Sequence, residues 1–176
     1  ALAAGQMANA SGASVVAGVV AGYEVMCRLG RALKPADHYD RGFHPTATTG
    51  AFGATVSAGR ALGLNAEQLS MALGICLSQA SGSMQFLVNS AWTKRFQVGN
   101  AAMVGVIAAS LASQGFVGAS EAIEGDCGFL RSYSPDPDSL LAVAGLRENW
   151  ETLQIGVKPY PSCRFSHAAI DGIIDI

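Results

Sequence analysis

Charged side chains are scarce in this sequence of 176 residues. Eleven Lys and Arg and 13 Asp and Glu make up 14% of the chain, and the formal net charge is -2. Binding to nucleic-acid phosphates needs basic side chains clustered on one face. Eleven scattered cations do not supply such a face, so the composition argues against a nucleic-acid partner.

Closely spaced cysteines and metal-binding patterns are also missing. Cys27, Cys76, Cys127 and Cys163 form no Cys-x-x-Cys pair, and only three histidines are present. Zinc sites and secreted disulfide scaffolds depend on close, repeated spacings of these residues. The glycine-rich runs lack the strand and the Lys-Ser/Thr pair of a nucleotide-binding loop. We therefore expect no metal and no cofactor, and we expect free thiols in a reducing cytoplasm.

Strongly apolar runs of membrane-spanning length are missing too. Residues 1–23, 68–93 and 96–120 carry no charge, but Gln, Asn, Ser and Gly dilute all three stretches. A spanning helix needs about 20 predominantly apolar residues. We interpret these stretches as buried helices of a soluble protein with no membrane partner. Because the chain begins with Ala1 rather than Met and ends inside an apolar segment, we expect it to be part of a longer protein.

What the sequence does contain is small apolar residues at helical spacing. Ser11 or Ser14 is a candidate N-cap for a helix that runs to about Leu33, and Gly18 and Gly22 predict close packing of that helix. Three more long helices are predicted at residues 46–62, 65–80 and 99–114. The predicted fold class is an all-α, Ala/Gly-rich helical domain.

The segments between these helices are predicted to be loops. Residues 37–41 form an acidic and aromatic loop, in which we expect His38 at the surface. Residues 82–97 form a long polar connection of the kind that is usually functional.

The C-terminal part differs from the rest. Residues 152–158 alternate in polarity and predict the one strand of the chain. Pro159 and Pro161 prevent regular continuation and lead into a final helix that carries His167. The change predicts a helical domain over residues 1–155, followed at 156–176 by a crossover strand and the start of a smaller α/β domain.

Three short segments, residues 41–46, 93–100 and 158–163, each place a His or Lys at a break beside an apolar helix. A fold presents cations at such breaks without burying them unpaired. Removing a proton beside a carboxylate builds negative charge, so the reaction needs a base and fixed cations. The three segments together predict such a site.

The candidate catalytic residues are His44, Lys94 and Lys158. His44 has the side chain whose ordinary pKa lies nearest neutrality, so it can act as base or acid. Lys94, Arg95 and Lys158 can bind carboxylates, and a desolvated lysine can itself become a base. Taken singly, each residue has an ordinary structural explanation, and only their joint pattern favours catalysis. Which residue is the base stays open at this point.

The order and spacing of these segments resemble the MmgE/PrpD family over essentially the whole chain. The resemblance rests on Arg-Gly-Phe-His-Pro at 41–45, Thr-Lys followed by Gly-Asn-Ala-Ala at 93–102, and Lys-Pro-Tyr-Pro-Ser-Cys at 158–163. The family includes 2-methylcitrate dehydratases, cis-aconitate decarboxylases and an iminodisuccinate epimerase. It implies a large helical domain, a smaller α/β domain, and a homodimer that acts on a small polycarboxylate.

By this resemblance, His44, Lys94 and Lys158 fall on positions that line a cleft between the two domains, with Arg95, Cys163 and His167 as candidate substrate contacts. The decarboxylase branch has a His where this chain has Cys163, which favours dehydration over decarboxylation. The family implies a cofactor-independent hydro-lyase, with an isomerase or epimerase and a decarboxylase as alternatives. A hypothesis from another class is a non-catalytic helical oligomerisation module, in which the Gly/Ala faces serve packing between subunits.

Overall fold

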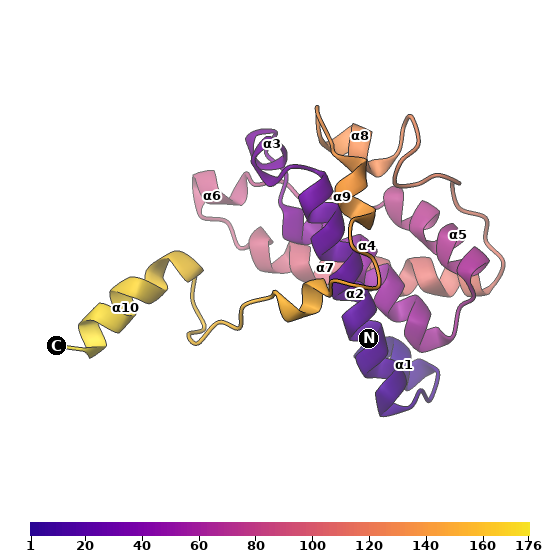
Figure 1. Cartoon of the computed structure of the whole chain (residues 1–176), viewed down its shortest axis with the longest axis horizontal. Coiled ribbons are helices and arrows are strands. Elements are labelled where there is room, and N and C mark those ends of the chain that lie inside the picture. Colours follow the sequence, from indigo (N-terminus) through magenta and orange to yellow (C-terminus); the bar gives the residue numbers. More distant parts are fainter.

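The computed structural model describes residues 1–176, and all of its regular elements are helices (Figure 1). A single antiparallel bridge, Phe43 to Ser83, is the one β-type pairing. The prediction of an all-α fold is therefore confirmed. The elements, in chain order, are α1 (Leu2–Met7), α2 (Gly12–Ala32), α3 (Pro35–Asp40), α4 (Pro45–Leu62), α5 (Ala66–Leu77), α6 (Phe86–Asn89), α7 (Thr93–Ser113), α8 (Phe129–Tyr133), α9 (Ser139–Val143), η1 (Glu151–Leu153), η2 (Arg164–Ser166) and α10 (His167–Ile174).

Helix α4 lies at the centre of the bundle, with α2 and α7 packed along it. Glycines allow the three helix backbones to approach closely. A Cβ atom on Gly22 would lie 2.8 Å from the carbonyl oxygen of Gly53, and one on Gly18 would lie 2.9 Å from that of Ser57. The close packing predicted from the spacing of Gly18 and Gly22 is confirmed, and its partner is α4.

Helices α4 and α7 run in the same direction. Near their starts, His44 lies beside Gln97. One to three turns further on, Gly50 faces Ala101, and Gly105 faces the backbone between Ala54 and Thr55. The N-terminal ends of both helices therefore meet at one end of the bundle, where each contributes partial positive charge from its free N–H groups.

The main core fills the space between α2, α4, α5 and α7, and α8 closes it. Phe52 of α4 and Phe129 of α8 are fully buried, with ring centroids 4.5 Å apart. Helices α2 and α7 are long and apolar enough to cross a membrane by length and composition. Both pack along α4, and α2 carries the Glu24–Arg28 ion pair. These contacts favour their interpretation as packing helices of the bundle.

Local sequence signals fix two helix starts, and the first of them is as predicted. The Ser11 hydroxyl accepts a hydrogen bond from the Ser14 amide and caps α2. Asn65 and Gln68 form a reciprocal capping box at the start of α5. Each cap satisfies backbone N–H groups that the first helical turn leaves free.

Two segments predicted as loops contain helices instead. Residues 35–40 form α3, which begins at Pro35 because a missing N–H costs nothing in a first turn. Residues 82–97 contain α6 and the first turn of α7, which starts at Thr93 rather than Gly99. Lys94 and Arg95 therefore project from a helix and not from a loop.

The strand predicted at residues 152–158 is absent. Residues 151–153 form η1 and the chain then runs without regular structure, with Val157 91% exposed. A strand needs a neighbour for its backbone hydrogen bonds, and no extended segment lies beside these residues to provide one. The alternation of polarity was therefore misleading. The division into domains at 155/156 stays a prediction.

Candidate active site

The loop before α4 and the loop before α6 are hydrogen-bonded to each other. The His44 amide donates to the Gly82 carbonyl at 2.9 Å, and the Met84 amide donates to the Gly42 carbonyl at 2.8 Å. His44 is also the N-cap residue of α4. This pairing fixes the backbone of His44 at the positive end of the helix, as its place before Pro45 predicts.

The His44 side chain is buried and held on two sides. Its Nδ1 lies 2.9 Å from Oε1 of Gln97, and its ring meets the Phe86 ring edge-on with centroids 5.3 Å apart. Only 5% of the residue is exposed. Its Nε2 makes no hydrogen bond, yet it is not among the enclosed polar atoms that lack a partner, so it keeps contact with solvent. The ring therefore offers one free nitrogen.

Burial lowers the pKa of His44 from its ordinary value, since a charged imidazolium loses solvation there. The hydrogen bond to Gln97 acts in the opposite direction, and the positive charge of Lys94 lowers the pKa further. The lowered pKa favours the neutral form of His44. A neutral imidazole is the form that can accept a proton.

Lys94 and Arg95 lie on the exposed first turn of α7, and the charge of Lys94 acts on His44. The Lys94 Nζ lies 5.8 Å from the centre of the Phe86 ring, and the Arg95 guanidinium lies 5.1 Å from the centre of the Trp92 ring. Both cations border a hollow of about 650 Å³ between α6 and the start of α7. Its lining is completed by Leu87, Ser90, Ala91 and Val98. The hollow combines an apolar wall with two cations that have no carboxylate partner.

His38 lies below the surface and packs against Phe43, the residue before His44. The expectation that His38 lies at the surface is therefore wrong. It is fully buried, with Nε2 2.9 Å from the Thr48 hydroxyl and Nδ1 3.0 Å from the Tyr133 carbonyl. Its ring stacks on Phe43 with centroids 5.2 Å apart. It therefore ties the loop that carries His44 to α4 and α8.

The third predicted segment lies apart from this site. The Lys158 Nζ donates to the Ser162 carbonyl at 3.2 Å, and Cys163 is exposed. His167 is buried against the Tyr160 ring, and neither of its ring nitrogens has a partner. Every hydrogen bond of residues 155–176 has both partners within that segment.

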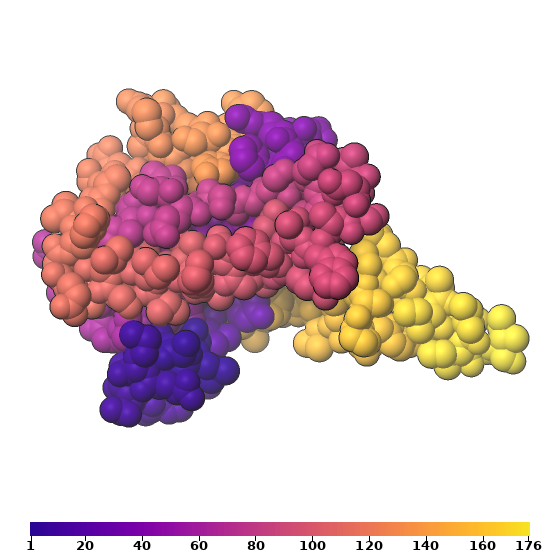
Figure 2. Space-filling model, turned by 180° about the vertical axis from the view of Figure 1, so that it is seen from behind, coloured from indigo at the N-terminus to yellow at the C-terminus, as the bar shows by residue number.

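Figures 1 and 2 show this C-terminal segment projecting from the helical bundle, with α10 at its end. The structure thus brings Lys94 near His44, while Arg95 follows Lys94 on the same helical turn and borders the same hollow as Lys94. It does not bring Lys158, Cys163 and His167 to them, and the predicted role of these three residues stays a prediction.

The sequence matches the model of a protein family. Residues 1–141 match the model of the MmgE/PrpD N-terminal domain. The chain belongs to the MmgE/PrpD family. The resemblance noted from the three sequence segments is confirmed, and the matched residues include His44, Lys94 and Arg95.

The MmgE/PrpD chain is also similar to several curated proteins. It is 31% identical over 170 residues to the cis-aconitate decarboxylase of Aspergillus terreus, covering 93% of this chain and 34% of that protein. It is 29% identical over 167 residues to the cis-aconitate decarboxylase of Homo sapiens, covering 94% and 34%. It is 32% identical over 135 residues to that of Mus musculus, covering 74% and 27%. The chain thus spans about a third of the length of these relatives.

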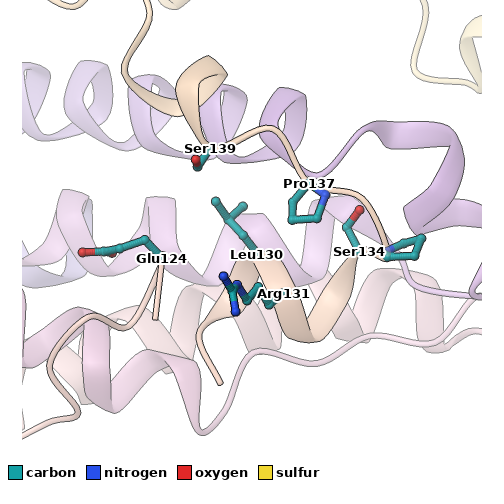
Figure 3. A pocket seen from close by; sticks show the side chains of 7 residues that line it. Glu124, Leu130, Arg131, Ser134, Pro137 and Ser139 are labelled. Atoms are coloured by element: carbon teal, nitrogen blue, oxygen red, sulfur yellow. The ribbon is translucent and has the colours of Figure 1, made fainter. Parts of the chain in front are cut away.

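Another hollow of the MmgE/PrpD chain, about 530 Å³, lies between α8 and α9 (Figure 3). Its one basic residue, Arg131, donates to the Asp126 carboxylate at 2.6 Å. Glu124 adds a negative charge to the same lining. A carboxylate entering this hollow meets no unpaired cation, so we place the candidate site at His44 and not here.

Sequence reasoning missed two residues of the site, Phe86 and Gln97. Phe86 touches both His44 and Lys94, and Gln97 binds the His44 ring. Gln97 follows Lys94 by three residues, and such residues are neighbours on a helix. A helix predicted to start at Thr93 would have pointed to Gln97, whereas the loop prediction for residues 82–97 concealed it.

Proposed function

We propose that this protein is a lyase that acts on a small di- or tricarboxylate. The observation that carries the proposal is the buried His44, with one free ring nitrogen, near Lys94. Lys94 borders a hollow together with Arg95, and no acidic side chain neutralises either cation. A base next to fixed cations is what proton removal beside a carboxylate requires. The MmgE/PrpD membership supports the same class.

The reaction that these groups serve best is dehydration, as in a 2-methylcitrate dehydratase. Nε2 of neutral His44 takes the proton from the carbon next to a carboxylate, and the electron pair left on that carbon forms a carbon–carbon double bond. The hydroxyl group on the neighbouring carbon leaves and, with a proton from a general acid, becomes water. Lys94 and Arg95 bind the carboxylate while negative charge grows on it.

Decarboxylation of cis-aconitate is the second candidate, and the names of the relatives favour it. In that reaction the bond from carbon to one carboxylate breaks, carbon dioxide leaves, and the retained electron pair takes up a proton. The same cations serve this chemistry, with the protonated form of His44 as the proton donor. Epimerisation is the third candidate reaction, and it needs only removal of the proton and its return to the other face of the carbon.

The test is a thermal-shift and turnover screen of the protein against citrate, 2-methylcitrate, cis-aconitate, iminodisuccinate and succinate. A bound acid raises the melting temperature by mass action on the folded state. We expect stabilisation by at least one acid and its loss in Lys94→Ala. Arg60→Ala is the matched control, because Arg60 is exposed in the last turn of α4, at the opposite end of the bundle.

The products separate the candidate reactions. Carbon dioxide release from cis-aconitate identifies a decarboxylase, whereas formation of a conjugated alkene from a hydroxy acid identifies a dehydratase. Lys158→Ala tests the role of the third segment in the same assay. If no acid stabilises the protein and none is turned over, the lyase proposal is wrong and the oligomerisation module takes its place.

We further propose that the protein works as a homodimer in the cytoplasm. The family resemblance supports the dimer. All four cysteines are free, which supports a reducing compartment. Sedimentation of the purified protein tests the first statement, and cell fractionation tests the second.

A further inference from the structure

The His44 ring is the end of a short hydrogen-bond relay. Gln97 Nε2 donates to the Ser83 carbonyl at 2.8 Å, and Gln97 Oε1 lies 2.9 Å from His44 Nδ1. Gln97 therefore joins the ring to the backbone of the loop before α6. That loop is the one whose Gly82 carbonyl binds the His44 amide.

The orientation of the Gln97 side chain is dictated by Ser83. A backbone carbonyl can only accept hydrogen bonds, so the amide must turn its NH₂ group toward Ser83. The amide oxygen then faces His44, and it too can only accept. The proton between the two side chains must consequently belong to Nδ1 of His44.

We infer that Gln97 is a positioning residue that sets the tautomer of His44, with the proton on Nδ1 and the lone pair on Nε2. The relay follows from geometry alone, while its catalytic meaning rests on the proposed function. In the relay tautomer the basic nitrogen is Nε2, the one that keeps contact with solvent. The opposite tautomer would leave Nε2 protonated and unable to accept a proton.

The relay also holds the ring after proton transfer. When Nε2 takes a proton from the substrate carbon, Nδ1–H continues to donate to Gln97 Oε1. The imidazolium therefore keeps the same hydrogen bond as the neutral ring. The loop at 82–84 and α6 carry no titratable side chain. On α7, Lys94 is the charged group that acts on the ring. Hence no carboxylate competes with Gln97 for the proton on Nδ1.

The first experiment measures the tautomer and needs no substrate. The protein is labelled with ¹⁵N-histidine, and the imidazole nitrogens are observed by long-range ¹H–¹⁵N NMR at pH 7.5, with His44→Gln used for assignment. We expect Nδ1 of His44 to be protonated and Nε2 to be bare. A His44 that carries its proton on Nε2 in the unmodified protein overturns the relay, whatever the activity.

The second experiment removes the relay. In Gln97→Leu we expect the His44 signals to move toward the Nε2–H tautomer and kcat/KM to fall by about tenfold or more, mainly through kcat, because general-base catalysis contributes about 10²–10⁴-fold. In Gln97→Glu a carboxylate faces Nδ1–H, so the pKa of His44 should rise and the acidic limb of the pH–rate profile should move to higher pH. Gln114→Leu, near the other end of α7, is the matched control and should leave both readouts unchanged.

The outcomes separate this inference from the proposed function. An unchanged tautomer in Gln97→Leu overturns the relay. A second outcome is that the tautomer changes in Gln97→Leu, kcat/KM does not change, and His44→Gln is fully active. In that case the relay stands, but the assignment of His44 as the base is wrong. If His44→Gln is inactive but Gln97→Leu turns over at the normal rate despite the altered tautomer, the positioning role of Gln97 is wrong.

Discussion

Replacing Arg28 of α2 by alanine should destabilise the protein far more than the same change at Arg31 on the same helix. Arg28 is 3% exposed, and its guanidinium uses all three nitrogens. It donates to the Glu24 carboxylate at 3.2 Å and to the carbonyls of Ala144 and Asn149, both at 2.7 Å. The side chain thus fastens the strap, residues 144–152, across α2.

The magnitude follows from what Arg28→Ala leaves behind. The Glu24 carboxylate, whose side chain is 13% exposed, loses its cation, and two carbonyls lose their charged donor. Removing one partner of a buried ion pair costs about 3–5 kcal/mol. Arg31 also pairs with the strap, through Glu151, but its side chain is 50% exposed. A solvent-screened pair of this kind contributes about 0–1 kcal/mol.

Urea unfolding followed by circular dichroism measures both variants. We expect the urea midpoint of unfolding to fall several times further in Arg28→Ala than in Arg31→Ala, with similar slopes if both variants unfold in one step.

The variant Glu24→Gln tests the same network through the pH dependence of stability. Burial raises the pKa of Glu24, but hydrogen bonds from Thr152 and Arg28 outweigh it, so the pKa is lowered. Its stabilising contribution is full above the unfolded pKa and is lost as the pH falls through the folded one.

In Glu24→Gln this acid-dependent loss should be absent, so its stability at low pH should approach that of the unmodified protein. Equal losses of unfolding free energy in Arg28→Ala and Arg31→Ala would refute this reasoning, because the burial of the Arg28 network would then add nothing to stability.

Two more predictions concern the loop and the cation at the candidate site. A Cβ on Gly82 would lie 2.5 Å from the Cβ of Ala47, so Gly82→Ala should destabilise the protein by about 1–3 kcal/mol and lower turnover. Gly99→Ala in α7 meets nothing within 4 Å and should stabilise it by up to about 1 kcal/mol; similar shifts in melting temperature for both variants would contradict this. Lys94→Met removes a positive charge that lowers the pKa of His44, so an NMR titration of His44 should move to higher pH, and an unmoved curve would place the two groups too far apart to interact.

Features of this fold that depend on a few neighbouring residues were predictable from sequence. The caps at Ser11 and Asn65 are local hydrogen bonds, and the sequence contains both partners of each. Pro45 fits the first turn of a helix, where its missing N–H costs nothing. The spacing of Gly18 and Gly22 predicts a close approach of another helix but does not identify that helix. These features survive because tertiary contacts do not compete with them.

Features that depend on distant partners were not predictable. His38 reads as a surface residue among Asp and Tyr, but Tyr133, 95 positions away, supplies one of the two hydrogen bonds that bury it. Residues 152–158 alternate like a strand, and only a neighbouring strand would make them one. The tautomer of His44 depends on Gln97 of α7 and on Ser83 of the loop before α6, and only the packing of these elements brings both to the ring.

The three motif segments differ in what holds them. The packing of α4 on α7 forces the first two together, since helices that run in parallel place His44 and Lys94 at the same end. The third segment has no such constraint within the chain. The Arg28 network fixes the strap as far as Thr152, whereas residues 155–176 hydrogen-bond only with one another. The candidate base and the candidate cations Lys94 and Arg95 therefore belong to the helical bundle, while the position of Lys158 depends on how residues 155–163 lie against that bundle.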